Sequence, residues 1–216
     1  MNRDLSEYRK SYDKKALVKS ELPESPFNLF SNWFTEVEEA GGVDEANAMT
    51  LATTGLDGFP KARIVLLKHF DNEGFVFYSN YESEKGKAIE ANTNVCISFF
   101  WPNLERQVII KGFVDRISET KSTEYFQSRP RGSQLGAWAS DQSTIIDSRE
   151  NLEKKLAALE EQYKNKKIPK PDFWGGYCIK PVEFEFWQGR PNRLHDRIRY
   201  TLDKENTNWK IDRLSP

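Results

Sequence analysis

The segment from residue 47 to residue 118 constrains the fold most strongly, because short apolar runs alternate there with turn signals. The runs are rich in β-branched and aromatic residues, which favour β-strands. They read AMTLATT (48–54), KARIVLLKHF (61–70), GFVFYSN (74–80), NVCISFFW (94–101) and RQVIIKGFVDRIS (106–118). Strands joined by turns as tight as GLDG, DNEG and PNLE pair antiparallel. Five or six such strands in one compact domain predict a barrel.

Helices and further strands are predicted around this segment. Ser25-Pro26 supplies a capping serine and a proline at the first helical position, and Gly41-Gly42 ends that helix. A short polar helix is predicted over 83–92 and an amphipathic helix over 148–166. Residues 119–140 begin as a helix and turn irregular around SRPRGSQ. Three more strands are predicted, over 177–189, 193–202 and 208–214.

These elements predict an α+β, mainly β, protein in which helices pack outside an antiparallel barrel. We expect residues 1–24 to form a flexible N-terminal arm, because they are polar and of mixed charge. Residues 25–216 are expected to form a single domain. The chain has 216 residues, which is long enough to bury a substantial core.

Composition excludes several classes of function. The net charge is −1 and the sequence pI is about 6.2, so general attraction to nucleic acid or to an anionic membrane is not expected. The polar N-terminus does not resemble a signal peptide, and no apolar run is long enough to span a membrane. Cys96 and Cys178 lie in apolar runs without zinc-ligand spacing, so we expect two buried, reduced thiols. The sequence therefore predicts a soluble, cytoplasmic protein.

Common nucleotide and hydrolase motifs are absent from the sequence, which instead clusters cations and hydroxyls at strand ends. Arg63 and Lys68 lie at opposite ends of one apolar run, where both could equally be solvent-exposed strand ends. Tyr78-Ser79 ends a strand just before Ser83-Glu84-Lys85 opens a helix, which is a suitable place for a phosphate group.

Two further clusters lie later in the chain. Tyr125, Arg129 and Ser133 fall within YFQSRPRGS and offer directional donors for an anion, although a basic surface loop would read the same. In RPNRLHDRIRY (190–200), alternation along a strand would place Arg193, His195 and Arg197 on one face. The alternative is a charged edge strand, but such edges favour lysine, and these are arginines and a histidine beside Trp187.

Together the clusters resemble the pyridoxamine (pyridoxine) 5′-phosphate oxidase family, in family order over nearly the whole chain. The matching stretches are RIVLLK (63–68), FYSN (77–80), LERQV (104–108), YFQSRPRGSQLGAW (125–138), Gln142-Ser143, FWGG (173–176), EFWQG (185–189), RLHDR (193–197) and WKIDRLSP (209–216). The resemblance implies a split β-barrel that binds FMN and works as a homodimer with shared active sites. It also implies that strands from about 175 to 216 serve dimerisation and the active site.

The resemblance also implies roles for individual residues. The implied FMN contacts are Arg63, Ile64, Val65, Leu66, Leu67, Lys68, Tyr78, Ser79, Lys85, Gln107, Gln142, Ser143, Trp187 and Arg197. The implied substrate contacts are Arg9, Tyr12, Lys68, Tyr125, Arg129, Ser133, Arg193 and His195, of which Lys68, Tyr125, Arg129 and Ser133 hold the phosphate. Arg193 and His195 would lie against the pyridine ring and are the candidate catalytic residues.

The implied reaction oxidises pyridoxamine 5′-phosphate or pyridoxine 5′-phosphate to pyridoxal 5′-phosphate, with O2 as the electron acceptor. One position departs from the family pattern, since Glu84 stands where a second basic residue is frequent, and a carboxylate repels a phosphate unless it points away. Two other hypotheses remain at this point: an FMN oxidoreductase that does not use a vitamin phosphate, and a non-catalytic carrier of FMN or pyridoxal phosphate. A nucleic-acid-binding module is disfavoured by the near-neutral charge.

Overall fold

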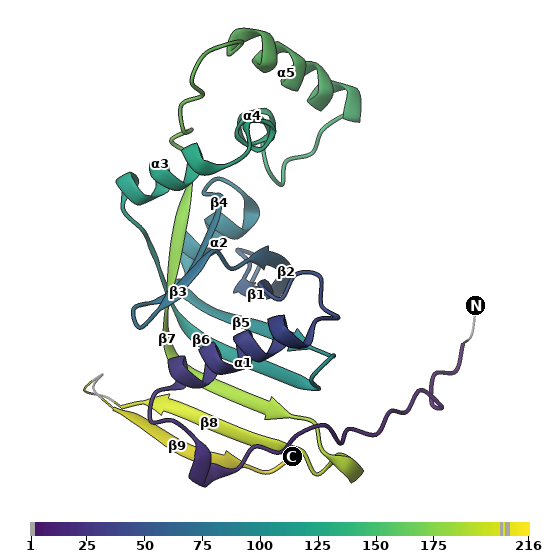
Figure 1. Ribbon diagram of the computed structural model, residues 1–216. Helices are drawn as coiled ribbons and strands as arrows, with labels where there is room; N and C mark the ends of the chain where they lie inside the picture. Colours follow the sequence, from purple (N-terminus) through teal and green to yellow (C-terminus); the bar gives the residue numbers. More distant parts are fainter. Residues whose placement is uncertain (1–2, 204, 206–207) are drawn as a thin grey trace. The chain divides into compact units, whose positions relative to one another are not determined.

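The computed structural model describes residues 3–203, 205 and 208–216 (Figure 1). Its helices are η1 (Lys19–Glu21), α1 (Pro26–Ala40), α2 (Glu84–Ala91), α3 (Glu119–Ser128), α4 (Arg131–Ala139), α5 (Arg149–Gln162) and η2 (Pro191–Arg193). Its strands are β1 (Ala48–Thr54), β2 (Pro60–Leu66), β3 (His69–Asp71), β4 (Gly74–Asn80), β5 (Asn94–Trp101), β6 (Arg106–Arg116), β7 (Trp174–Gln188), β8 (Asp196–Leu202) and β9 (Trp209–Leu214).

The strands described here form one nine-stranded sheet, with the order β2-β1-β5-β6-β7-β4-β3 and with β8 pairing to β7 and β9. The length of strand β7 explains why β8 and β9 lie off this order. Its first half pairs antiparallel with β4, where Tyr78 faces Gly176. Its second half pairs antiparallel with β8, where Trp187 faces Arg197. Strand β7 therefore pairs with both the FYSN stretch and the end of the RLHDR stretch, which are far apart in the sequence.

The chain divides into two compact units, and several strands contribute to both. The first unit comprises residues 1–50, 97–111 and 181–216, and the second comprises residues 51–96 and 112–180. Whether residues 25–216 behave as a single domain after an N-terminal arm stays a prediction.

The core of the first unit forms where α1 packs on aromatic residues of the sheet. Phe30 of α1 meets Phe99 with ring centroids 5.1 Å apart, and Trp33 meets Phe186 at 5.2 Å. All four side chains are buried. Fully burying a large apolar side chain contributes about 1.5–3 kcal/mol, so this aromatic face is what holds α1 in place.

The core of the second unit joins its three larger helices to the start of β7. Phe126 of α3, Leu135 of α4 and Trp174 of β7 are buried together with Ile168. Leu156 and Leu159, from the apolar stripe predicted for 148–166, pack against this cluster from α5. The helices α4 and α5 lie side by side in Figure 1.

The strands AMTLATT, GFVFYSN and NVCISFFW are confirmed at their predicted bounds, but the run 61–70 is not one strand. The strand β2 ends at Leu66 and β3 begins at His69, because Leu67 turns into the core and the Lys68 N–H pairs with the Val76 carbonyl at 2.8 Å. Strand alternation from Arg63 therefore does not extend to Lys68.

Three smaller expectations also need correction. The stretch SRPRGSQ leaves the helical conformation only at Arg129 and Pro130, and helix α4 starts at Arg131. Ser25 stands at the N-cap of α1, but its side chain makes no capping hydrogen bond. Cys96 and Cys178 form no disulfide, as predicted, yet both are half-buried rather than fully buried. In the described part of the chain, no helix has the length and apolar character needed to cross a membrane.

Candidate active site

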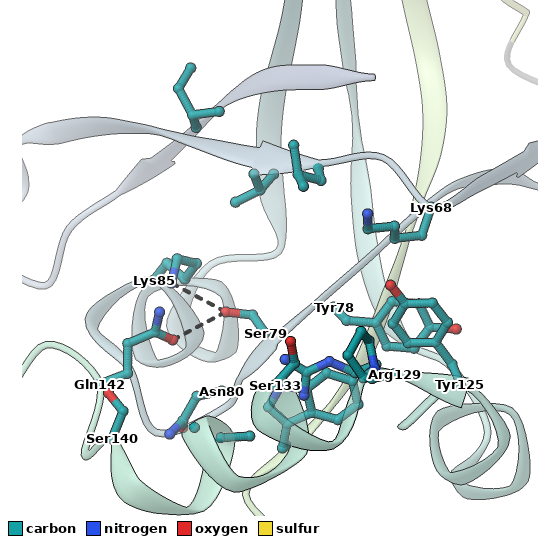
Figure 2. Close-up of a pocket in the computed structure, with 17 residues that line it drawn as sticks. Lys68, Tyr78, Ser79, Asn80, Lys85, Tyr125, Arg129, Ser133, Ser140 and Gln142 are labelled. Atoms are coloured by element: carbon teal, nitrogen blue, oxygen red, sulfur yellow. Dashed lines mark hydrogen bonds between the residues drawn. The ribbon is translucent and has the colours of Figure 1, made fainter. Parts of the chain in front are cut away.

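A cavity of about 640 Å³ opens in the second unit, where the end of β2, the end of β4 and the starts of α2 and α4 converge (Figure 2). Its lining residues are Ile64, Val65, Leu66, Lys68, Tyr78, Ser79, Asn80, Lys85, Tyr125, Arg129, Pro130, Ser133, Gly136, Ala137, Ser140, Gln142 and Trp174. Eleven of these residues were predicted as cofactor or substrate contacts from the sequence. Their convergence makes this cavity the candidate active site.

Lys85 supplies one cationic corner of the cavity. It lies in the first turn of α2 and is only 8% exposed. Its Nζ donates to Ser79 Oγ at 3.2 Å and to Ser83 Oγ at 3.5 Å. Burial, and then the charge of Arg63, lower the pKa of Lys85. No carboxylate pairs with this ammonium in the described part of the chain, so the corner is suited to an anion.

The hydroxyls around Lys85 are held in place by the backbone and by Gln142. Ser83 caps α2 by accepting a hydrogen bond from the Gly86 N–H at 3.3 Å. Ser79 Oγ lies 3.5 Å from Gln142 Oε1, to which it donates, as the dashed lines of Figure 2 show. The helix start, the two serines and the ammonium thus direct donors and positive charge to one place.

Arg129 supplies a second cationic corner. Its guanidinium carbon lies 4.7 Å from the Trp174 ring centroid and 5.7 Å from that of Phe126. Burial lowers the pKa of Arg129, and the neighbouring Tyr125 opposes that change. Its Nη1 is buried and has no hydrogen-bond partner among the described residues. A buried, orphaned donor on a guanidinium is the expected feature of an anion site.

Aromatic rings form the wall beside Arg129. Tyr78 and Tyr125 stack with ring centroids 3.8 Å apart, and Tyr78 stacks on Trp174 at 5.4 Å. Burial raises the pKa of both tyrosines, so their hydroxyls remain protonated donors at neutral pH. Ser133, in the first turn of α4, and Lys68 complete this side of the cavity.

Three of the predicted cofactor contacts in this unit do not line the cavity. Arg63 turns to strand β1, since its Nη1 donates to the Thr53 side-chain Oγ1 at 2.7 Å and to the Leu51 carbonyl at 3.2 Å. Leu67 is buried in the core, and Ser143 is exposed with a left-handed φ of 73°. Conversely, Trp174, Asn80 and Ser140 line the cavity without having been predicted. The FWGG and FYSN matches had offered a signal for Trp174 and Asn80, but no matching stretch contains Ser140.

A second group of predicted residues gathers in the first unit around Trp187. The His195 ring lies 4.6 Å from the Trp187 ring, measured between centroids, and Tyr12 lies 5.7 Å from Trp187 and 5.9 Å from His195. Three aromatic residues from the N-terminal segment, β7 and the chain after η2 thus form one cluster. No distance pattern in the sequence joins Tyr12 to the other two.

The strand predicted over 193–202 is wrong at its start. The strand β8 begins at Asp196, and Arg193 closes the short helix η2. Asn192 and Arg193 both have left-handed backbones, with φ of 58° and 60°. Arg193, His195 and Arg197 therefore do not alternate along one strand face, because the backbone turns before β8 starts.

His195 is held as a hydrogen-bond acceptor. Its Nδ1 accepts the backbone N–H of Arg190 at 3.1 Å, which leaves the proton of the neutral ring on Nε2. Burial, and then the charge of Arg193, lower the pKa of His195. The imidazole is therefore neutral at physiological pH, with one defined donor.

The remaining predicted residues of the first unit differ in their exposure and in the polar contacts of their side chains. Arg197 is paired, since its Nε donates to Glu185 Oε1 at 2.8 Å and its Nη1 to the Ser215 carbonyl at 2.8 Å. Hydrogen bonding to Glu185 raises the pKa of Arg197. Gln107 is half-buried on β6, and Arg193 and Arg9 are exposed. Arg9 Nε donates to the Ser6 carbonyl at 3.1 Å.

Comparison with known proteins shows which protein families this chain matches. The family described as pyridoxamine 5′-phosphate oxidase matches residues 36–163. A second family, described as the pyridoxine 5′-phosphate oxidase C-terminal dimerisation region, matches residues 174–216. The chain belongs to the pyridoxamine 5′-phosphate oxidase family. This confirms the resemblance inferred from the sequence motifs.

Relatives within the oxidase family cover the whole chain. The pyridoxine/pyridoxamine 5′-phosphate oxidase of Flavobacterium johnsoniae is 61% identical over 212 residues, covering 98% of this chain and 99% of the relative. That of Flavobacterium psychrophilum is 59% identical, covering 99% of this chain and 100% of the relative.

Solved structures with this fold include PhzG from Burkholderia lata in complex with tetrahydrophenazine-1-carboxylic acid. It has a TM-score of 0.87 and 28% identity, covering 96% of this chain and 100% of that one. A pyridoxamine 5′-phosphate oxidase-related, FMN-binding protein from Nostoc punctiforme has a TM-score of 0.71 and 16% identity, covering 90% and 100%. The latter likeness shows the fold, and the predicted mainly β split barrel is confirmed.

Proposed function

We propose that this protein is an FMN-dependent oxidase that converts pyridoxamine 5′-phosphate and pyridoxine 5′-phosphate to pyridoxal 5′-phosphate. O2 is the final electron acceptor, and the products include H2O2 and, from the amine, ammonia. Full-length relatives named for these two substrates support the proposal. Its chemical basis in the structure is the presence of two cationic corners in one cavity.

Two anion sites in a single cavity are what a phosphorylated cofactor and a phosphorylated substrate require. Lys85 and Arg129 both lose their charge-stabilising water on burial, and neither is paired with a carboxylate in the described residues. A buried charge without a partner is costly, so each is stabilised when a phosphate binds. This pair of corners is the observation that carries the proposed function.

FMN fits the Lys85 corner, where we assign its phosphate to Lys85, Ser79 and the start of α2. Helix N-termini with hydroxyls and a cation are well suited to a phosphate group. Gln142 and the residues of β2 from Ile64 to Leu66 line the same cavity and are assigned to the rest of the cofactor. Arg63 would contribute through its charge near Lys85 rather than from the cavity wall. When bound, FMN would accept a hydride from C4′ of the substrate and pass the electrons to O2.

The substrate phosphate fits the Arg129 corner. Arg129, Tyr125, Ser133 and Lys68 line it, and all four present donors to an anion. The Trp174 ring holds the guanidinium from one side, so its free Nη1 keeps a fixed position. Anchoring the phosphate in this way orients the reacting carbon before chemistry begins, which lowers the entropic part of the barrier.

Arg193, His195 and Tyr12 are assigned to the pyridine ring of the substrate, and Gln107, Trp187 and Arg197 to the cofactor. His195 Nε2–H would donate to a substrate oxygen or nitrogen, because Nδ1 is already occupied by the Arg190 N–H. Arg9 is assigned to the substrate with Tyr12, as part of the same N-terminal segment. These assignments follow the family's motif positions.

The proposal includes a homodimer with active sites shared between subunits, and a cytoplasmic location. The match of residues 174–216 to a C-terminal dimerisation region supports the dimer. The near-neutral charge favours neither nucleic acid nor a membrane as a partner.

Purified protein tests the proposal directly. We expect a yellow protein with flavin absorbance that forms pyridoxal 5′-phosphate and H2O2 when either substrate is added in air. A yellow protein that yields neither product would contradict the proposed activity. The non-phosphorylated vitamers serve as matched controls, and they should turn over far more slowly because the Arg129 corner stays empty.

A second candidate is a flavin oxidase acting on an aromatic carboxylic acid without a phosphate, favoured by the likeness to PhzG. The Arg129 corner would then hold a carboxylate. Turnover of an aromatic carboxylic acid in air, with little turnover of either vitamin phosphate, would support this second candidate.

A further inference from the structure

Glu105 is a buried carboxylate in the turn between β5 and β6. Its side chain is 1% exposed, and its φ of 57° lies in the left-handed region, where glycine is the favoured residue. A glutamate in such a place calls for an explanation in terms of its side chain. The partners of the carboxylate supply that explanation.

The polar partners of the Glu105 carboxylate are not its neighbours in the sequence but residues of the N-terminal segment. Oε2 accepts the backbone N–H of Asp13 at 3.0 Å and that of Lys14 at 3.2 Å. Lys10 Nζ lies 3.6 Å from Oε1. Within the described residues, the hydrogen bonds and the ion pair of this carboxylate therefore all come from residues 10–14, more than ninety positions away in the sequence.

The same turn contacts the strand that carries Trp187. The Glu105 carbonyl accepts the Gly189 N–H at 2.8 Å. A Cβ at Gly189 would lie 2.7 Å from Tyr12 Cβ and 3.0 Å from Glu105 Cβ, so Gly189 leaves the space that Tyr12 occupies. Glu105 thus fixes the backbone directly after Tyr12, whose ring packs on Trp187 and His195.

A second attachment of the N-terminal segment differs in kind. Asp196 Oδ2 accepts the Leu17 N–H at 3.0 Å, but Asp196 Oδ1 also binds Arg213 Nη1 at 2.6 Å. Asp196 therefore keeps a partner when the segment leaves, whereas Glu105 loses its contacts. A buried carboxylate that depends on one segment makes docking of that segment the favoured state.

We propose that Glu105 is a positioning residue that docks residues 10–14 and so holds Tyr12 against His195. The docking itself stands on the contacts of this chain alone. Its consequence for the reaction rests on the proposed function, because Tyr12 and His195 are there assigned to the substrate. Under the proposed function, Glu105 therefore affects the binding of the substrate and not the rate of the chemical step.

Limited trypsin digestion of the full chain tests the docking without using activity. Glu105→Gly removes the carboxylate and relieves the left-handed backbone, so the fold should persist. We expect cleavage after Lys14 and Lys15 to become about tenfold faster, equivalent to about 1.4 kcal/mol. In Glu105→Gln the amide oxygen still accepts from both N–H groups, and cleavage should stay close to the wild-type rate. Equal rates in wild type and Glu105→Gly would overturn the proposal.

Lys10→Met is the matched control for charge. It removes only the ion pair of an exposed lysine, and such pairs contribute little. Cleavage after Lys14 should then change less than about twofold. A large acceleration in this variant would mean that the ion pair, and not the pair of N–H bonds, holds the segment.

Hydrogen exchange of the wild-type protein decides the question if Glu105→Gly fails to fold. The Asp13 and Lys14 amides should exchange slowly, because both are bound to a buried acceptor. Exchange of these two amides at the rate of an unstructured peptide would overturn the proposal.

Steady-state kinetics tests the consequence for the substrate. Glu105→Gly should raise KM for pyridoxamine 5′-phosphate about tenfold and change kcat less than about twofold. In a Tyr12→Ala background the same change should add less than about twofold to KM, because Glu105 acts through Tyr12. An undiminished effect in that background would contradict this role. Wild-type protein without oxidase activity would instead overturn the proposed function and leave the docking result standing.

Discussion

Both carboxylate oxygens of Glu84 lie 2.6 Å from Lys61 Nζ, so Glu84 is turned away from the cavity that its neighbour Lys85 lines. The pair is exposed, whereas Lys85 is buried. Adjacent positions in the first turn of α2 thus point in different directions, as the helical rotation of about 100° per residue requires. The acidic residue that departs from the family pattern does not oppose a phosphate at Lys85.

This arrangement predicts opposite outcomes for two neighbouring substitutions. Lys85→Ala should weaken FMN binding about 10- to 100-fold, the loss expected for one charge-assisted hydrogen bond. Glu84→Gln should change the affinity less than about twofold, since its partner is a surface lysine. Flavin fluorescence titration of the apoprotein measures both. Similar losses in the two variants would argue against the Lys85 corner as the phosphate site.

Arg129 should not tolerate lysine. Lys keeps the charge but loses the planar face that lies over Trp174 and the orphaned Nη1 donor. We expect Arg129→Lys to raise KM for pyridoxamine 5′-phosphate about tenfold, with unchanged FMN affinity.

Arg131→Lys is the control for Arg129, because Arg131 donates to the carbonyls of Tyr163 and Lys166 outside the cavity. It should lower Tm slightly and leave KM unchanged. If Arg131→Lys raised KM as much as Arg129→Lys, the effect would belong to the fold of α4 and not to a phosphate contact.

Stability should fall as the pH drops through the range in which His195 titrates. Its pKa in the folded protein is lowered from 6.5 by burial and by Arg193, so the unfolded chain binds the proton first. The unfolded state is therefore favoured as the pH falls below about 6.5, and the stability contribution is present above that value. His195→Asn keeps an acceptor for the Arg190 N–H but does not titrate. The decrease in Tm between about pH 7 and pH 5.5 should be smaller in this variant than in the wild type.

Two glycine-to-alanine changes should affect stability in opposite directions. A Cβ at Gly86 would lie 2.0 Å from the Tyr81 carbonyl oxygen, so Gly86→Ala must displace the first turn of α2. A Cβ at Gly132 meets nothing within 4 Å in α4. Gly86→Ala should lower the free energy of unfolding by about 1–3 kcal/mol, and Gly132→Ala should raise it by about 0.5–1 kcal/mol. Urea unfolding measures both, and a stabilised Gly86→Ala would contradict the close packing at Tyr81.

Much of the fold follows from local pattern. Apolar runs such as GFVFYSN and NVCISFFW became strands at their predicted bounds, because alternation and turn residues act over a few positions. The spacing of Leu152, Leu156 and Leu159 likewise predicts the helix α5, along which these three side chains are half-buried. Local errors arose where two influences compete. Leu67 turned into the core and interrupted the run 61–70, and two left-handed residues, Asn192 and Arg193, delayed the start of β8 until Asp196.

The sequence by itself determined the family, the mainly β fold and most of the cavity's polar residues. Each of these can be recognised from short contiguous motifs. Only the tertiary structure decided which way those residues face. Glu84 and Lys85 are adjacent in the chain but have different surroundings, and Arg63 belongs to a motif yet bonds to the backbone of β1. The contact of Glu105 with Asp13 and Lys14 has no sequence signal, since it joins residues about ninety positions apart. Such contacts depend on how the chain packs, which no local pattern encodes.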